Sequence, residues 1–253
     1  MLPEPDSYLT IDRYVNMIQN KKDAPFNEKT MKTIEHIVYS IANAENNISK
    51  IDDKTVEGQE ILKYEGYTGT KTRHFYNNIC ERPGTKYIEI GTWNGSSSIS
   101  TVYKNNIEEA LFIDNWCQFG GTSDIFKSAI NKFGQGSKCY LLESDCWKVD
   151  LSTIGKFNVY LYDGDHAELD HFKALEYYLQ VLDDEFIFIV DDFNFYNVRD
   201  GTMRAINKLN LNIKFRHEIF LSPDQLQGMP NHYGKKTWWN GIAIYLLEKP
   251  KIV

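Results

Sequence analysis

The chain has 253 residues, of which 42% are hydrophobic and 25% charged, which is typical of a soluble globular protein with a full core. Its formal net charge of −7 offers no basic surface for a polyanion, so we expect no nucleic-acid partner. No apolar run reaches the roughly 18 residues that a membrane span needs, and residues 1–6 lack the features of a signal peptide; we expect a cytoplasmic protein with no membrane partner.

Residues 1–80 carry helical and polar patterns without a strand signal, which predicts an N-terminal helical cap or lid before a second domain over residues 81–253. The clearest helix of the cap spans residues 30–42, where apolar side chains recur at helical spacing. The following polar stretch, residues 43–60, is interpreted as a loop. Residues 64–69, which include two tyrosines, and residues 71–74 are candidate lid elements, with a purely structural role as the alternative.

From residue 86 onward, short β-rich runs alternate with helical stretches, which is typical of a parallel sheet with crossover helices. The predicted strands cover residues 87–90, 111–113, 138–142, 157–162, 186–190, 213–221 and 242–247. The predicted helices cover residues 96–103, 123–133, 167–182 and 202–209. Since the last two strands follow one another, the pattern predicts an α/β fold of Rossmann-like, doubly wound type, with seven strands, mostly parallel, and an antiparallel closing strand.

The helix expected over residues 167–182 is amphipathic by sequence. Its apolar face would carry Leu169, Phe172, Leu175, Leu179 and Leu182. His171 lies one helical turn or more from His166, and we expect it to be solvated.

A glycine-containing loop follows the first predicted strand. It has the form E-x-G-x-x-x-G and leads into a helix that begins with serines. Glycines let the backbone turn sharply and approach a ligand, and the first amides of a helix can hold a carboxylate. The spacing differs from the dinucleotide fingerprint, and the acidic residue at the strand end would face a cationic amino group or a solvent network. We therefore expect a zwitterionic ligand bound by Glu89, Gly91, Thr92, Asn94, Gly95 and Ser96.

Acidic residues also follow the next two predicted strands. Asp114, with Asn115 beside it, ends the second strand, where a carboxylate can accept hydrogen bonds from both ribose hydroxyls. A simple turn at the strand end is the alternative interpretation. After the third strand, Asp145 is a candidate acceptor for an adenine amine, and Cys146 a candidate backbone donor.

This order of motifs resembles that of the class I methyltransferases. The similarity covers roughly residues 86–247, including the closing pair of strands. It implies S-adenosylmethionine as the cofactor, whose methyl group is passed to a nucleophile.

Two further acidic segments end the strands over residues 157–162 and 186–190. They are Asp163-Gly164-Asp165-His166 and Asp191-Asp192. In an open α/β sheet the carboxyl ends of the strands meet at the ligand-binding edge, where several carboxylates repel one another unless a cation neutralises them. Oxygen ligands suit Mg²⁺, Mn²⁺ or Ca²⁺. The alternative is that these acids only cap the helices that follow.

The two acidic segments resemble those of the metal-dependent sugar O-methyltransferases of macrolide biosynthesis. The resemblance implies that Asp163, Asp191 and Asp192 bind Mg²⁺ or Mn²⁺ and that His166 is the general base, with Asp165 as the alternative base or substrate ligand. Asp163 would also border the cofactor. The expected acceptor is a small molecule, a sugar or nucleotide-linked sugar.

Two other interpretations stay open. A catechol-like phenol is a second candidate acceptor, for which Trp238 and Trp239 would form a flat slot. A non-catalytic nucleotide-binding protein of the same fold is the third. Homo-oligomerisation, as a dimer, is a general expectation for such enzymes.

Overall fold

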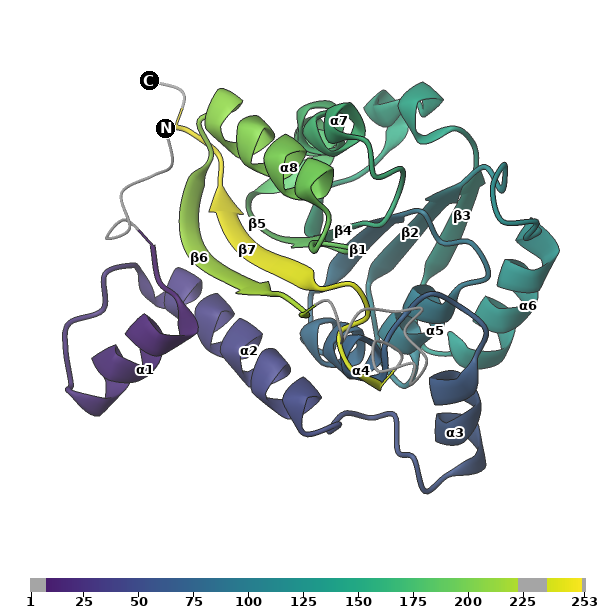
Figure 1. Ribbon diagram of the computed structural model, residues 1–253, viewed down its shortest axis with the longest axis horizontal. Coiled ribbons are helices and arrows are strands. Elements are labelled where there is room, and N and C mark those ends of the chain that lie inside the picture. Colours follow the sequence, from purple (N-terminus) through teal and green to yellow (C-terminus); the bar gives the residue numbers. More distant parts are fainter. Residues whose placement is uncertain (1–7, 223–235, 252–253) are drawn as a thin grey trace.

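A twisted sheet lies at the centre of the molecule, between two layers of helices (Figure 1). The computed structural model describes residues 8–222 and 236–251. The helices are α1 (Ile11–Gln19), α2 (Glu28–Glu45), α3 (Val56–Lys63), α4 (Thr70–Ile79), α5 (Ser96–Val102), α6 (Ser123–Phe133), α7 (Glu168–Tyr178) and α8 (Tyr196–Lys208). The strands are β1 (Lys86–Ile90), β2 (Glu109–Asp114), β3 (Cys139–Glu143), β4 (Phe157–Tyr162), β5 (Leu182–Val190), β6 (Asn212–Ile219) and β7 (Ile242–Glu248).

The sheet has the strand order β3-β2-β1-β4-β5-β7-β6. Strand β7 runs antiparallel to both β5 and β6, whereas β1 to β5 pair in parallel. The predicted fold class, with seven strands and an antiparallel closing strand, is confirmed. Because β1, β2, β4 and β5 are parallel, the loops that follow them meet at one edge of the sheet.

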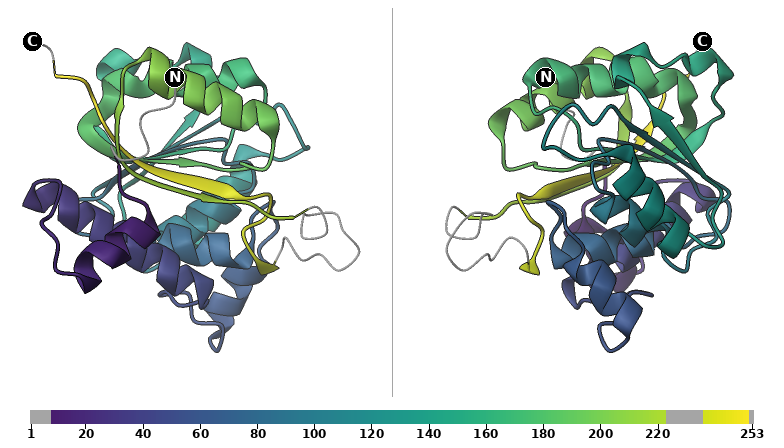
Figure 2. Two further views of the ribbon diagram at one scale, coloured as in Figure 1. Left: turned by 60° about the vertical axis from the view of Figure 1, so that its left-hand side comes forward. Right: turned by 90° about the vertical axis from the view of Figure 1, so that its right-hand side faces the viewer.

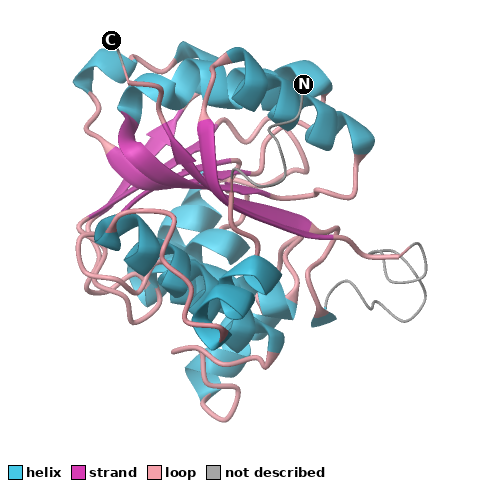
Figure 3. Ribbon diagram, turned by 90° about the vertical axis from the view of Figure 1, so that its left-hand side faces the viewer, coloured by secondary structure: helices cyan, strands magenta, loops and turns pink. Residues whose placement is uncertain are grey.

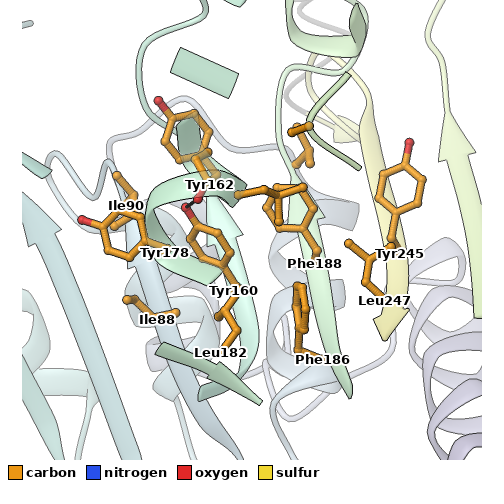
Figure 4. Packing of buried hydrophobic residues seen from close by; sticks show 14 of the residues in the cluster. Ile88, Ile90, Tyr160, Tyr162, Tyr178, Leu182, Phe186, Phe188, Tyr245 and Leu247 are labelled. Carbon is orange, nitrogen blue, oxygen red and sulfur yellow. Dashed lines mark hydrogen bonds between the residues drawn. The ribbon is translucent and has the colours of Figure 1, made fainter. Parts of the chain in front are cut away.

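The strands bury both of their faces. One face packs on α7 and α8, and Figure 4 shows the aromatic side chains of Tyr160, Tyr162 and Phe188 side by side within this cluster. The other face packs on residues of α2 and α4, such as Ile37 and Phe75. Figure 2 and Figure 3 show these two helical layers on opposite sides of the sheet. Burial on both faces explains why the strands are nearly continuous hydrophobic runs in the sequence.

The residues expected to form a cap therefore supply part of one helical layer. The predicted helix over residues 30–42 is present as α2, whose N-terminus is capped by the side chain of Asn27 accepting from the Thr30 N–H at 3.0 Å. The expectation of a continuous loop over residues 43–60 was wrong, because α3 begins at Val56. The Thr55 side chain caps α3, and Ile61 anchors it in the interior.

The predictions for the two helices beside β5 needed correction. The chain leaves the α-helix after Tyr178, so Leu179 and Leu182 do not continue its apolar face. Leu169 is 58% exposed, whereas His171, expected to be solvated, is 1% exposed. Helix α8 begins at Tyr196 rather than at residue 202. None of the described helices combines the length and apolar character needed to cross a bilayer.

Candidate functional site

Backbone contacts bring the predicted site segments together at the carboxyl edge of the sheet. The N–H of Gly91 donates to the carbonyl of Ile113 at 3.0 Å, and the N–H of Asp163 donates to that of Ile90 at 2.9 Å. A Cβ atom placed on Gly91 would lie 1.9 Å from the carbonyl oxygen of Asp163. The glycine loop and the first acidic segment therefore touch, and only a glycine allows this approach.

The glycine loop is held in a left-handed conformation at three positions. Gly91 has φ 86°, Gly95 φ 93° and Trp93 φ 40°. The backbone of Trp93 is fixed from both sides, because its N–H donates to Asp114 Oδ2 at 2.8 Å and its carbonyl accepts from the Trp116 indole at 2.9 Å. A bulky residue in this region of φ is strained, and such strain persists where surrounding contacts enforce it.

Several buried polar atoms of this loop lack a partner within the protein. Thr92 Oγ1, Trp93 Nε1 and Asn94 Oδ1 are buried without a hydrogen bond to any described residue. Buried polar groups are nearly always hydrogen-bonded, so three orphaned atoms on consecutive residues indicate a loop built to contact a polar ligand.

Glu89, expected to face a cationic group or solvent, points into the protein. It is fully buried and accepts hydrogen bonds from the hydroxyls of Tyr87, Ser97 and Ser98 at 2.8, 2.5 and 3.0 Å. Burial raises its pKa to about 7, against the opposing effect of these three donors. Glu89 thus joins the end of β1 to the first turn of α5; its contact with a ligand stays a prediction.

The other cofactor-binding candidates lie at the same edge but are largely engaged within the chain. Helix α5 begins at Ser96, after the left-handed Gly95, and the Ser96 hydroxyl is 2.8 Å from that of Thr68. Asp114 Oδ1 also accepts from the Trp116 N–H, and Asn115 Oδ1 accepts from that of Cys117. Ribose recognition by Asp114 would use the lone pairs that remain.

The adenine-side candidates form a short turn after β3. Asp145 Oδ1 accepts from the Trp147 N–H at 3.0 Å and Oδ2 lies 3.1 Å from Lys148 Nζ; both contacts lower the pKa of Asp145. The carbonyl of Cys146 accepts from the Tyr178 hydroxyl at 2.7 Å, which fixes the turn against α7. These contacts give the turn a defined shape, while its role toward adenine stays a prediction.

Asp163, His166 and Asp192 form the acidic group of the site. Each can present one ligand atom such that all three atoms lie within 4.8 Å of one another. His166 Nε2 is 2.8 Å from Asp192 Oδ2, and the His166 ring stacks on Phe195. Asp192 Oδ1 is buried without a partner in the described part of the chain. Two carboxylates, one of them with an orphaned oxygen, and one imidazole are a donor set that fits a divalent cation.

Asp191, a predicted metal ligand, is not part of this group. Its Oδ1 accepts from the Asp192 N–H at 2.9 Å and its Oδ2 from the Tyr76 hydroxyl of α4 at 3.2 Å. The structure thus brings together Asp163 and Asp192 of the expected ligand set and adds His166. Asp165 Oδ1 accepts from the Ala167 N–H at 2.9 Å, the capping contact considered as the alternative from the sequence.

The electrostatics of this edge favour positive charge. Burial, together with the charges of Asp191 and Asp192, raises the pKa of Asp163 well above its ordinary value. Burial and the neighbouring Asp192 raise the pKa of Asp191 to about 8. Both shifts disfavour the charged forms of Asp163 and Asp191, and a cation bound beside them would favour those forms.

The sequence did not indicate an aromatic cluster that lies beside the glycine loop. Tyr67, from the segment before α4, stacks on Trp93 with ring centroids 4.9 Å apart. Phe119 packs edge-on against both rings, and Trp239 lies 5.9 Å from Tyr67. Tyr67 and Phe119 are 51% and 67% exposed. The sequence marked the segment of Tyr67 as a candidate lid element but did not indicate its contact with the glycine loop.

Solved structures of other proteins share the fold that carries this site. The structure is similar to a candidate caffeoyl-CoA O-methyltransferase from Staphylococcus aureus, with a TM-score of 0.52 and 14% identity over 85% of this chain and 99% of that one. The chain has the class I methyltransferase fold. An S-adenosylmethionine-dependent O-methyltransferase from Thermotoga maritima is also similar, with a TM-score of 0.52 and 11% identity, over 81% of this chain and 73% of that one.

Comparison of sequences gives less similarity to known proteins than comparison of structures. No protein-family model matches the chain. An uncharacterised protein of Acanthamoeba polyphaga mimivirus is 22% identical over 142 residues, which are 54% of this chain and 64% of the viral protein. The match thus spans less than two thirds of that relative.

Proposed function

We propose that the chain is an S-adenosylmethionine-dependent O-methyltransferase that uses a divalent cation and methylates a hydroxyl of a sugar or nucleotide-linked sugar. The observation that carries the proposal is the meeting of two groups at one sheet edge. One group is the set of orphaned polar atoms in the glycine loop, and the other is the Asp163–His166–Asp192 group. The loops that carry them touch where Gly91 packs on the Asp163 backbone.

The glycine loop supports a methyl donor. Bound S-adenosylmethionine would supply an electrophilic methyl group on a sulfonium. Thr92 and Asn94 would satisfy their buried oxygens on its polar groups, and Asp114, which fixes the Trp93 backbone, would keep the loop open for it. The S-adenosylmethionine-dependent O-methyltransferase from Thermotoga maritima, which has a similar fold, supports this choice of cofactor.

The acidic group supports activation of an acceptor hydroxyl. A divalent cation bound there would act as a Lewis acid and lower the pKa of the hydroxyl. Asp163 and Asp192 would hold it, with the orphaned Asp192 Oδ1 as the oxygen that lacks another partner. His166 would accept the hydroxyl proton: Asp192 orients its ring and, by hydrogen bonding, raises its pKa, which strengthens it as a base.

A phenol is the second candidate acceptor, and it would stack on the exposed rings of Tyr67 and Phe119. The flat slot expected from Trp238 and Trp239 does not support it, since these side chains are only 2% and 3% exposed. Sugar rings also pack on aromatic faces, so the cluster suits both classes. A turnover screen of nucleotide sugars against catechols, with Mg²⁺ or Mn²⁺ added, separates them by which class is methylated.

Cofactor choice is tested by thermal unfolding. At a hundredfold excess over Kd, S-adenosylmethionine should stabilise the fold by about 2.7 kcal/mol and raise Tm by roughly 5 to 10 °C, whereas NAD should leave Tm unchanged. A shift with NAD alone would refute the donor site. A shift with S-adenosylmethionine but no methylation of any acceptor would favour a non-catalytic binding protein instead.

The metal arrangement is tested by a pair of neighbouring substitutions. Asp192→Asn should lower turnover at least about 100-fold, because it removes a ligand and the partner of His166. Asp191→Asn should retain turnover within about tenfold, since the amide oxygen can still accept from the Asp192 N–H and the amide NH₂ can donate to the Tyr76 hydroxyl oxygen. Turnover and Mn²⁺ binding by calorimetry are measured for both. Equal loss in the two variants would restore Asp191 as a ligand.

A further inference from the structure

Strand β3 is an open edge of the sheet (Figure 1). Within residues 8–222 and 236–251 it pairs with β2 on one side and with nothing on the other. None of its five residues is buried, and Tyr140 is 54% exposed, whereas β1 buries four of five. Open edges of this kind are commonly protected by charge, proline or a covering segment.

The opposite edge of the sheet is protected by the chain itself. Leu9 forms a bridge with Phe215 of β6, donates its N–H to the Lys214 carbonyl at 2.9 Å, and accepts from the Arg216 N–H at 2.9 Å. No segment of the described part of the chain pairs with β3 in this way. Its residues, Cys-Tyr-Leu-Leu-Glu, carry only one charge.

The crossover that follows β3 leaves one face of this edge open as well. In place of an α-helix, the chain forms two single 3₁₀ turns, Cys146–Lys148 and Leu151–Thr153, between β3 and β4. A cavity of about 470 Å³ remains beside the edge, and Tyr140, Leu142 and Ile154 are among its lining residues. Apolar side chains therefore flank the open edge on that face.

The backbone of β3 points its free groups outward at every second residue. The Ala110 N–H donates to the Lys138 carbonyl and the Ser144 N–H donates to that of Asp114. The strand alternates with a period of two, so Tyr140 and Leu142 also bond toward β2. The N–H and C=O groups of the other three residues then point away from the sheet; these residues are Cys139, Leu141 and Glu143.

We propose that two copies of this chain form a dimer by antiparallel pairing of their β3 strands about a two-fold axis at Leu141. In this register Leu141 pairs with Leu141 of the partner subunit, and Cys139 pairs with Glu143 of the partner subunit. All three outward-facing residues of each strand then find backbone partners, in about six hydrogen bonds. The two sheets become continuous through the interface.

The side chains of β3 fit this self-pairing. Tyr140 lies directly across from Leu142 of the partner subunit, on the face where the cavity opens, so each exposed ring covers an apolar side chain. Glu143 faces a cysteine rather than another acid, and Lys138 faces Ser144 of the partner subunit. No like charges therefore lie opposite each other. A two-fold interface needs this, because the same strand supplies both sides of it.

Sedimentation velocity on the full chain tests the proposal, with a dimer expected at micromolar concentration. Leu141→Pro should shift the protein to monomer, because it removes the outward N–H at the axis and leaves the bonds of Tyr140 and Leu142 to β2 intact. Leu141→Ala is the matched control: it removes the same packing, keeps the N–H, and should remain dimeric. Circular dichroism verifies that both variants are folded.

Register is tested by cross-linking. In a Cys117→Ser background, Glu143→Cys should form a disulfide with Cys139 of the partner subunit under mild oxidant, since paired Cα atoms at about 5.5 Å lie within disulfide range. Ser144→Cys, one residue out of register, should not. A monomer at about 100 μM, or equal cross-linking of both variants, would overturn the proposal. Neither measurement depends on methyl transfer, so failure here leaves the proposed function standing.

Discussion

Gly91 is the residue at which the two halves of the candidate site meet. Its φ of 86° disfavours any side chain, and a Cβ atom would lie 1.9 Å from the backbone oxygen of Asp163. The substitution Gly91→Ala would therefore place a side chain at a left-handed φ and also push the glycine loop away from the Asp163 segment. We expect it to lower the free energy of unfolding by about 2 to 4 kcal/mol and to abolish the Tm shift with S-adenosylmethionine.

Gly84 offers a matched control for this substitution. It has a similar φ of 79°, but a Cβ atom there would meet nothing within 4 Å. Gly84→Ala should cost only the left-handed strain, about 1 kcal/mol, and keep the cofactor shift. Urea denaturation measures both variants. If both substitutions lower the free energy of unfolding by the same amount, the close approach of Gly91 to Asp163 does not contribute to stability.

At the scale of residues, spacing predicted which segments meet but not which atoms bond. The order of strands places Asp163, Asp191 and Asp192 at one edge from sequence alone. That Asp191 accepts a hydrogen bond from Tyr76 depends on its side-chain rotamer and on a helix about a hundred residues earlier in the chain. The approach of His166 to Asp192 likewise depends on side-chain rotamers. No local pattern carries such information. The Tyr67 cluster was missed for the same reason.

At the scale of elements, Arg73 joins three segments of the N-terminal region. It is 2% exposed, and its guanidinium donates to the carbonyls of Ile61, Tyr64 and Thr68 at 2.7, 2.9 and 3.2 Å. Burial lowers its pKa to about 10. The guanidinium thus ties the end of α3 and the turn that carries Tyr67 to α4, and this turn is held rather than free.

Arg73→Met should keep the packing of the aliphatic stem but leave three buried carbonyls without their donor. We expect a loss of about 3 kcal/mol or more in the free energy of unfolding, with faster proteolysis of the turn before α4. Arg204→Met is the control, because that side chain is 60% exposed in an ion pair with Glu168 and should cost under about 1 kcal/mol. Similar values for both variants would contradict the anchoring role of Arg73.

Elements with strong periodicity or clear termini were predictable from sequence. Residues 157–162 and 123–133 match β4 and α6 at both ends. The errors fall where tertiary contacts decide. Helix α8 begins before residue 202 and runs through Gly201. Its packing on α7 requires glycine at this position, because a Cβ atom there would lie 2.2 Å from the Glu168 carbonyl oxygen. Whether the cap is a domain of its own stays a prediction, although α2 and α4 share a core with the sheet.

At the scale of the whole molecule, buried histidines link stability to pH. His74 and His171 are each 1% exposed, and burial lowers their pKa values to about 4 and about 3. The His74 ring bonds to the Ser49 hydroxyl at 2.8 Å. Both ring nitrogens of His171 lack a hydrogen-bond partner among the residues that the structure describes, and the ring packs edge-on against Tyr162. His171 is therefore the more informative of the two.

Replacing His171 should make the fold less sensitive to acid. An unfolded histidine titrates near pH 6.5, so between about pH 6.5 and 3 the unfolded chain binds a proton that the folded chain excludes, and stability falls as the pH drops. His171→Met removes this loss. Relative to the wild type, the variant should gain about 1.4 kcal/mol for each pH unit below 6.5.

Near pH 7, His171→Met should be neutral or slightly stabilising, because a buried polar ring without partners gives way to an apolar side chain of similar volume. Urea denaturation from pH 7.5 to 4.5 gives both slopes. Leu169→Met, on the exposed side of the same helix, should follow the wild type at every pH. Carboxyl groups with raised pKa values, such as Glu89, make stability rise as the pH falls. Their contribution is the same in the variant and the wild type, so it cancels in the difference between the two free energies of unfolding. Parallel curves would mean that His171 is protonated in the folded protein.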